Sequence, residues 1–181
     1  MFKKVFFAIL LTVLLGGCQK PPNFEQEHPG AKGQPPELLG YYAVKEVHPG
    51  ETWNIYLKAK DVDGDMKYIV AVLSVEGMGG SPTSEIWLKG ENRSAFDGYI
   101  FLNTPPGEIL VAGTAKLSAS IFIRDWAGNK SQTISLPLSF EPGATPDEVP
   151  PQWQQAAKHE LGYINNSLLG TEDLQNTRKS D

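Results

Sequence analysis

The feature that most constrains the fold is a two-residue alternation of apolar and polar side chains in the middle of the chain. In 115–124 every second residue faces one way, namely Leu117, Ala119, Ile121 and Ile123. Successive side chains of an extended strand point to opposite faces, so this spacing predicts a half-buried β-strand. The comparable segments are 41–47, 52–59, 66–75, 85–89, 95–103, 115–124 and 130–140, and turn-forming residues separate them.

Seven short strands in about 100 residues, with no helical pattern between them, predict a mainly β fold. We expect a single antiparallel β-sandwich over 41–140, and a β-barrel is the alternative. Segment 66–75 is apolar on both faces, as a central strand would be. Segment 85–89 is short, with Ile86 and Leu88 pointing inward, which suits an edge strand.

The residues from Ile123 to Ser131 read Ile-Arg-Asp-Trp-Ala-Gly-Asn-Lys-Ser. This segment resembles the Asp-x-Ala-Gly-Asn-x-Ser ending common in bacterial immunoglobulin-like and fibronectin-III-like domains. The resemblance implies an immunoglobulin-like β-sandwich. The chain departs from antibody domains in lacking their cysteine pair and central-strand tryptophan, so a subtype without a disulfide is implied.

The N-terminal residues have the pattern of a signal peptide over 1–17. Lys3 and Lys4 precede an uncharged apolar run from Val5 to Leu15, which suits secretion and is shorter than the roughly 20 residues that cross a bilayer. The run ends in Leu15, Gly16, Gly17 and Cys18, and this tetrapeptide resembles the lipobox of bacterial lipoproteins. The resemblance implies cleavage before Cys18 and a diacylglycerol, carrying fatty acids such as palmitate, on its thiol. The alternative is an ordinary secretory signal with a chance cysteine.

The segments that flank the sandwich are rich in proline or polar. Residues 18–40 predict a lipidated cysteine followed by a disordered tether, and 141–151 predict a second proline-rich linker. In 152–170 the residues at helical spacing are Trp153, Ala157, Leu161 or Ile164, and Leu168, which predicts a short C-terminal amphipathic helix. Residues 171–181 predict a disordered tail.

Charge and cysteine content exclude several classes of function. The formal net charge is −5 at pH 7, and an acidic chain without a basic patch argues against nucleic acid as a partner. Cys18 is the only cysteine. Once lipidated, it leaves no thiol for disulfides, zinc binding or catalysis.

Asp61, Asp63 and Asp65 form the densest carboxylate cluster. Carboxylates at every second position of a loop can surround a hard cation such as calcium. The loop is not an EF-hand, because methionine and valine stand where that motif needs glycine and glutamate. In an immunoglobulin-like order it lies at the same end as the Asp125 turn, so Asp125 or Asn129 is expected to complete a calcium site. The alternative is a solvated turn in which the aspartates cap backbone N–H groups.

The remaining candidate is Trp126, whose place on a hairpin predicts a contact with a protein or a glycan, or packing over the sandwich end. His28, His48 and His159 are scattered, and no catalytic motif is visible, so we expect no enzyme. The sequence therefore predicts an envelope lipoprotein that presents an immunoglobulin-like binding or structural module. The residue after the cysteine is Gln19 rather than Asp, which by the same resemblance implies the outer membrane. The alternative is an accessory subunit of an envelope complex, docking through the Asp/Trp loops or the helix.

Overall fold

A computed structural model describes residues 33–76, 82–106, 117–144 and 148–166. The expected signal peptide, Cys18, most of the tether and the tail lie outside these residues. The strands are β1 (Glu37–Ala43), β2 (Glu46–Val47), β3 (Thr52–Lys60), β4 (Met66–Val75), β5 (Thr83–Trp87), β6 (Ala95–Asn103), β7 (Leu117–Asp125), β8 (Ile134–Phe140) and β9 (Glu160–Tyr163). Three short 3₁₀ turns accompany them: η1 (Gly90–Arg93), η2 (Pro151–Trp153) and η3 (Ala156–Lys158).

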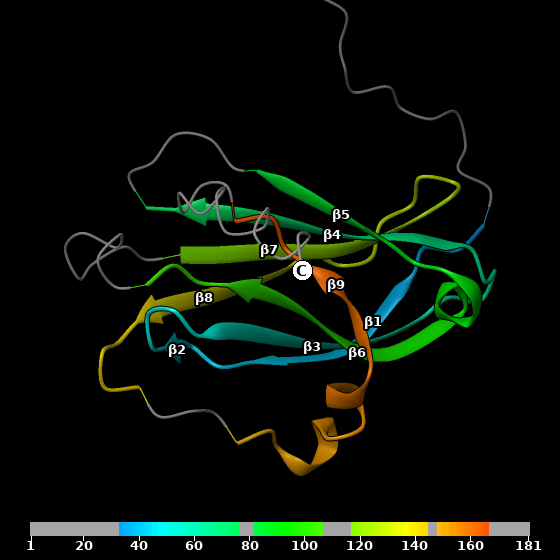
Figure 1. Ribbon diagram of the computed structural model, residues 1–181. Coiled ribbons are helices and arrows are strands. Elements are labelled where there is room, and N and C mark those ends of the chain that lie inside the picture. Colours follow the sequence, from blue (N-terminus) through cyan, green and yellow to red (C-terminus); the bar gives the residue numbers. More distant parts are fainter. Residues whose placement is uncertain (1–32, 77–81, 107–116, 145–147, 167–181) are drawn as a thin grey trace, which may run out of the picture.

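The strands form two stacked sheets (Figure 1). One sheet has the order β1-β3-β6-β9 and the other the order β2-β8-β7-β4-β5. The first, second and fifth strands of an immunoglobulin-like sandwich share one sheet, and the third, sixth and seventh share the other. Here β1, β3 and β6 take the first set of places, and β4, β7 and β8 take the second. The predicted sandwich is therefore confirmed, with immunoglobulin-like strand order.

The core lies between the two sheets and follows the predicted alternation. In β3, Trp53, Ile55 and Leu57 are fully buried, and the strand begins at the predicted residue and ends one residue later, at Lys60. In β7 the inward residues are likewise the predicted ones, and β5 is an edge strand of its sheet. Each buried aliphatic or aromatic side chain of this size contributes about 1.5–3 kcal/mol to folding. This burial holds both sheets together and fixes where the connecting loops emerge.

The sandwich is not wholly antiparallel, which corrects one part of the expected fold. The predicted first strand is two strands, β1 and β2, which belong to different sheets, and β2 pairs with β8 in parallel. Between them the chain crosses from one sheet to the other, and the Ser139 N–H donates to the Lys45 carbonyl at 2.8 Å. The structure also starts β1 at Glu37 rather than at residue 41, because Leu38 is buried in the core.

The predicted C-terminal helix is wrong. Between 148 and 166 the described chain forms η2, η3 and then β9, which pairs in parallel with β6. The Trp153 ring does pack, but against Tyr56 on the outer face of the first sheet, with ring centroids 6.3 Å apart. The free edge of β6 offers backbone hydrogen bonds that an isolated amphipathic helix cannot use, and Gly162 disfavours a helix. Tertiary pairing therefore overrides the helical spacing.

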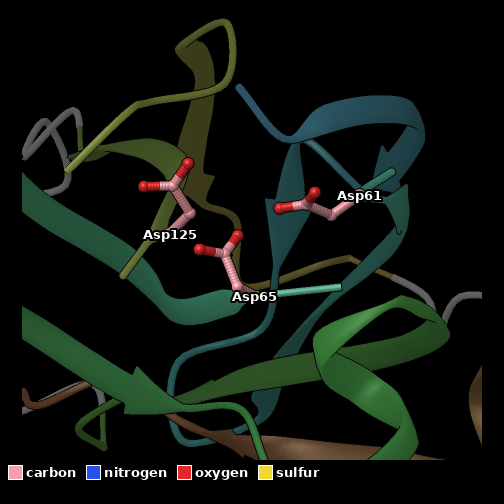
Figure 2. Close-up of side chains that lie close together, drawn as sticks. All are labelled: Asp61, Asp65 and Asp125. Atoms are coloured by element: carbon pink, nitrogen blue, oxygen red, sulfur yellow. The ribbon is translucent and has the colours of Figure 1, made fainter. Parts of the chain in front are cut away.

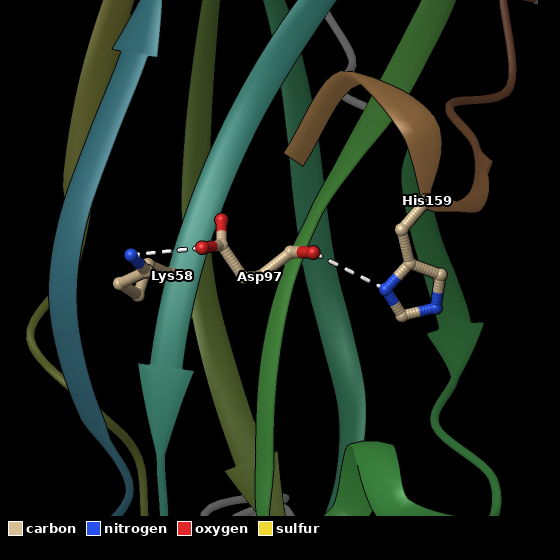
Figure 3. A network of polar contacts seen from close by, with 3 residues as sticks. All are labelled: Lys58, Asp97 and His159. Atoms are coloured by element: carbon tan, nitrogen blue, oxygen red, sulfur yellow. Dashed lines mark hydrogen bonds and ion pairs between the residues drawn. The ribbon is translucent and has the colours of Figure 1, made fainter. Parts of the chain in front are cut away.

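This C-terminal segment, 148–166, is fastened to the sheet by polar contacts (Figure 3). The His159 ring donates from Nδ1 to the Asp97 carbonyl at 3.2 Å, and the Asp97 carboxylate pairs with Lys58 at 2.8 Å. The Tyr99 N–H donates to the His159 carbonyl at 2.9 Å. Burial and the neighbouring Glu160 carboxylate raise the pKa of Tyr99. The segment thus supplies β9, the fourth strand of the first sheet.

Candidate functional site

Three carboxylates gather at one end of the sandwich, as Figure 2 shows. Asp61 and Asp65 come from the loop between β3 and β4, and Asp125 is the last residue of β7. One oxygen from each lies within 4.8 Å of the others. Asp61 and Asp125 are buried, and Asp65 is partly buried. The two loops that the sequence places at the same end do converge there.

Local turn chemistry holds Asp61 in place. Its N–H donates to the Ser94 carbonyl at 2.7 Å, and its Oδ1 accepts the Asp63 N–H at 2.8 Å. Gly64 has φ of 70°, a conformation that glycine adopts without strain. The capping that the sequence offered as an alternative to a metal site is therefore present. It uses only one of the two oxygens of Asp61.

Asp125 is held by the hairpin that follows it. Its Oδ1 accepts the Asn129 N–H, and its Oδ2 accepts the Asn129 side-chain amide, both at 2.7 Å. Gly128 has φ of 93° and closes the turn. The expected structural role of Asp125 is thus present, and Asn129 acts on the cluster by positioning Asp125.

The cluster carries unbalanced negative charge. Asp61 Oδ2 and Asp65 Oδ1 are buried atoms without a hydrogen-bond partner, although buried polar atoms are normally paired. Burial raises the pKa of Asp65, and the nearby carboxylates of Asp125 and Asp61 raise it further. Like charges held this close are costly unless a proton or a cation lies between them.

The cluster fits a calcium ion in size and donor type. Calcium takes carboxylate oxygens at about 2.3–2.6 Å, so ligands on opposite sides of one ion lie about 5 Å apart. Magnesium needs about 2.0–2.1 Å and a stricter octahedron. Asp61 Oδ2, Asp65 Oδ1 and a free lone pair of Asp125 are available as ligands. Backbone carbonyls and water supply the remaining ligands in sites of this kind.

Asp63 does not join the cluster, although it belongs to the predicted set. Its side chain turns toward the start of the described chain, where Oδ2 accepts the Gln34 N–H at 2.6 Å. A Cβ atom added at Gly33 would lie 2.6 Å from the same oxygen, so the entering backbone packs directly against Asp63. Asp63 therefore fastens the entering chain to the β3–β4 loop.

Trp126 lies beside the cluster, and its backbone N–H donates to the Asp65 carbonyl at 3.1 Å. Its ring is half exposed and lies 5.9 Å from the Trp87 ring, centroid to centroid. The Lys67 ammonium lies 4.2 Å from the Trp126 centroid and 5.5 Å from that of Trp87. The sequence reasoning missed Trp87 and Lys67. The alternation that points Ile86 and Leu88 inward was the signal that Trp87 points outward.

The comparisons with known proteins find neither a matching family model nor a matching curated protein. Three of the solved structures that are similar to part of this chain are the following. A PKD domain of an M14-like peptidase from a Thermoplasmatales archaeon is 16% identical over 60% of this chain and 97% of its own length, with a TM-score of 0.39. The sporulation control protein Spo0M from Bacillus subtilis is 13% identical over 60% of this chain and 50% of its own length, with a TM-score of 0.33. A CARDB domain from Pyrococcus furiosus, solved with di-metal ions, is 11% identical over 64% of this chain and 97% of its own length, with a TM-score of 0.29. The immunoglobulin-like arrangement is therefore assigned from the order of the strands in the two sheets and not from these similarities.

Proposed function

We propose that this protein is a lipid-anchored module of a bacterial cell envelope, and that its β-sandwich acts by binding. The observation that carries the anchor is the tetrapeptide ending in Cys18, preceded by Lys3, Lys4 and an apolar run from Val5 to Leu15. Two or three acyl chains give stable membrane attachment, because each buried methylene contributes about 0.8 kcal/mol. Within the described residues, no helix is long and apolar enough to cross a membrane. Gln19 favours the outer membrane in an envelope that has one.

The second part of the proposal is a calcium ion held by Asp61, Asp65 and Asp125. The observation that carries it is Asp61 Oδ2, a buried oxygen without a hydrogen-bond partner in a residue that is only 7% exposed. An unpaired buried acceptor costs about 1–3 kcal/mol, and more when it is charged. A cation among the three carboxylates would offset that cost. Such an ion would brace the β3–β4 loop against the β7–β8 hairpin.

The anchor is tested by expressing the full chain in a bacterial host supplied with an alkyne-bearing palmitate analogue. We expect the label on the protein, recovery in the membrane fraction, and a mass that corresponds to acylated Cys18. Cys18→Ser is the matched control and should lose the label. An unmodified thiol, with the protein free in the culture medium, would contradict the proposal.

The binding role is tested by cross-linking the acylated protein in cells and purifying it in detergent. Retention of a glycan or another envelope component through the loop end favours a display module. One protein recovered in a stoichiometric ratio favours the accessory-subunit role. The part of the accessory proposal that used a C-terminal helix no longer applies, so such docking would run through the Asp/Trp loops.

A further inference from the structure

The described chain enters the sandwich at the end that carries the three carboxylates. Gly33 and Gln34 lie against Asp63, and Glu37 is paired with Lys60 at the end of β3. Figure 1 shows the blue start of the chain at the same end as η1 and the β7–β8 hairpin. Whatever lies at Cys18 is therefore connected to this end of the sandwich.

The length of chain between Cys18 and this end is short. Fifteen residue steps separate Cys18 from Gly33. Fifteen residue steps span at most about 54 Å when fully extended, and about 46 Å in the polyproline II conformation that proline-rich chains favour. The sandwich is itself about 30 Å long, since β4 has 10 residues at about 3.3 Å each. Because the chain enters at the end with the carboxylates, that end can rest on the bilayer at any tether span, whereas the opposite end needs a tether that spans about 30 Å or more.

This end also carries two exposed tryptophans beside half-buried tyrosine, lysine and arginine side chains, which we call the Trp–Lys face. It consists of Val62, Lys67, Tyr68, Trp87, Arg93 and Trp126. Trp87 and Trp126 are each 50% exposed, and Val62 is 74% exposed. Tyr68 packs edge-on against Trp87 with centroids 4.5 Å apart. Tryptophan and tyrosine are enriched where proteins meet the headgroup region of a bilayer, because their rings are apolar with one polar group.

The positive charges of this face are not neutralised by carboxylates. The ion pairs among the described residues are Lys58–Asp97 and Lys60–Glu37, so Lys67 and Arg93 have no carboxylate partner in that part of the chain. Both cations instead lie over the Trp126 ring, at 4.2 and 5.8 Å from its centroid. Asp61 and Asp125 are buried beneath the surface. The face thus presents Lys67 and Arg93 without a carboxylate partner among the described residues, although Asp63 and Glu91 are exposed at the same end of the sandwich.

We propose that the Trp–Lys face docks on the bilayer that holds the acyl anchor, with Trp87 and Trp126 at headgroup depth and Lys67 and Arg93 against anionic headgroups. This inference rests on the proposed lipid anchor. Each basic residue near an anionic membrane surface strengthens association about fivefold. Acyl chains and face act together as two signals, and hold the sandwich upright rather than free on its tether.

The test uses tryptophan quenching by brominated lipid. The full chain is reconstituted into vesicles of phosphatidylglycerol and phosphatidylcholine with brominated acyl chains, and its fluorescence is compared with that in unbrominated vesicles. Trp87→Phe/Trp126→Phe should lose most of the bromine-dependent quenching, whereas Trp153→Phe, on the outer face of the first sheet, should keep it. Lys67→Gln/Arg93→Gln should reduce the quenching, and the charge-matched Lys45→Gln/Lys158→Gln should not.

The outcomes separate this inference from the anchor. Mass spectrometry of the same preparation reports acylation of Cys18. If that thiol is free, the anchor proposal fails, and the chain is coupled through Cys18 to a maleimide-bearing lipid for the same measurement. Equal quenching losses in Trp87→Phe/Trp126→Phe and Trp153→Phe, or quenching that is absent in wild type, would overturn the docking. The same holds if a soluble glycan or a co-purified protein, rather than lipid, protects the two rings.

Discussion

Asp125 accepts two hydrogen bonds of 2.7 Å from Asn129, one from the backbone N–H and one from the side-chain amide. The Asp125 N–H in turn donates to the Asn129 carbonyl at 3.1 Å. A carboxylate has about four lone-pair sites, so Asp125 keeps capacity for another ligand while it closes the hairpin. The same residue therefore joins the hairpin to the carboxylate cluster.

Asn129→Ala should destabilise the protein, because it removes the amide donor from a buried carboxylate while the backbone hydrogen bond remains. A hydrogen bond to a charged group contributes about 1.5–3 kcal/mol. We expect the free energy of unfolding, measured with urea, to fall by a value in this range. Asn103→Ala removes only a solvent-exposed hydrogen bond, which the Thr52 hydroxyl donates to Asn103 Oδ1 at 3.0 Å, and should change the free energy of unfolding by less than about 0.5 kcal/mol. Equal losses in the two variants would show that Asn129 does not secure Asp125.

Calcium should raise the melting temperature of the wild-type protein, and chelator should reverse the rise. A ligand present at about a hundredfold excess over its dissociation constant adds about 2.7 kcal/mol of stability. Asp61→Asn should abolish the response, since Asp61 Oδ2 is the unpaired oxygen of the cluster. Asp63→Asn is the matched control and should keep it. A wild-type melting temperature that does not change with calcium, or an equal rise in Asp61→Asn, would contradict the proposed calcium site.

The strands could be predicted because their signal is local. The alternation in β7 and the buried set Trp53, Ile55 and Leu57 in β3 repeat with the geometry of a single strand. The split of the first strand into β1 and β2 depends instead on which sheet each part joins. Which sheet each part joins is decided by contacts between residues far apart in the sequence, such as the hydrogen bond from the Ser139 N–H to the Lys45 carbonyl. These contacts have no signature in the local sequence of residues 37–47.

The C-terminal helix was mispredicted because helical spacing describes side chains and not backbone partners. Trp153 and Leu161 do pack against the rest of the protein. The backbone of 160–163, however, forms a strand because it pairs with the free edge of β6. Within the site, loop order was enough to bring Asp61, Asp65 and Asp125 together. The direction of the Asp63 side chain depends on the entering chain at Gln34, which the loop sequence alone does not contain.

The pH dependence of stability should show the cost of ionising Asp65 among the other carboxylates. Burial and the carboxylates of Asp125 and Asp61 raise its pKa, so the folded state keeps a proton that the unfolded state has released. The stability from this proton is complete below about pH 4 and is lost as pH rises through the folded pKa. In the presence of chelator, the melting temperature of Asp65→Asn should therefore rise relative to that of the wild type as pH increases above about 4.

Two comparisons make this pH prediction specific. Asp63→Asn should show only a small growing advantage over the wild type, because the Asp63 charge is the smallest of the causes that raise the pKa of Asp65. Saturating calcium should reverse the order, because the ion binds the ionised carboxylates and Asp65→Asn lacks one of them. If the difference in melting temperature between Asp65→Asn and the wild type does not change with pH in chelator, the ionised Asp65 carboxylate does not destabilise the folded state.

Gly98→Ala should detach the C-terminal segment from β6, because a Cβ atom at residue 98 would lie 2.6 Å from the His159 carbonyl oxygen and 2.9 Å from Leu161 Cγ. Backbone cannot yield to such a contact cheaply, and overpacking costs about 1–3 kcal/mol. We expect faster amide exchange at Ile164, whose N–H donates to the Phe101 carbonyl at 2.8 Å, and earlier proteolysis after η3. Gly143→Ala is the matched control, since nothing lies within 4 Å of its added Cβ. If both variants exchange at the wild-type rate, β9 does not depend on the bare backbone of Gly98, and its pairing with β6 must be maintained by the side-chain contacts around His159 instead.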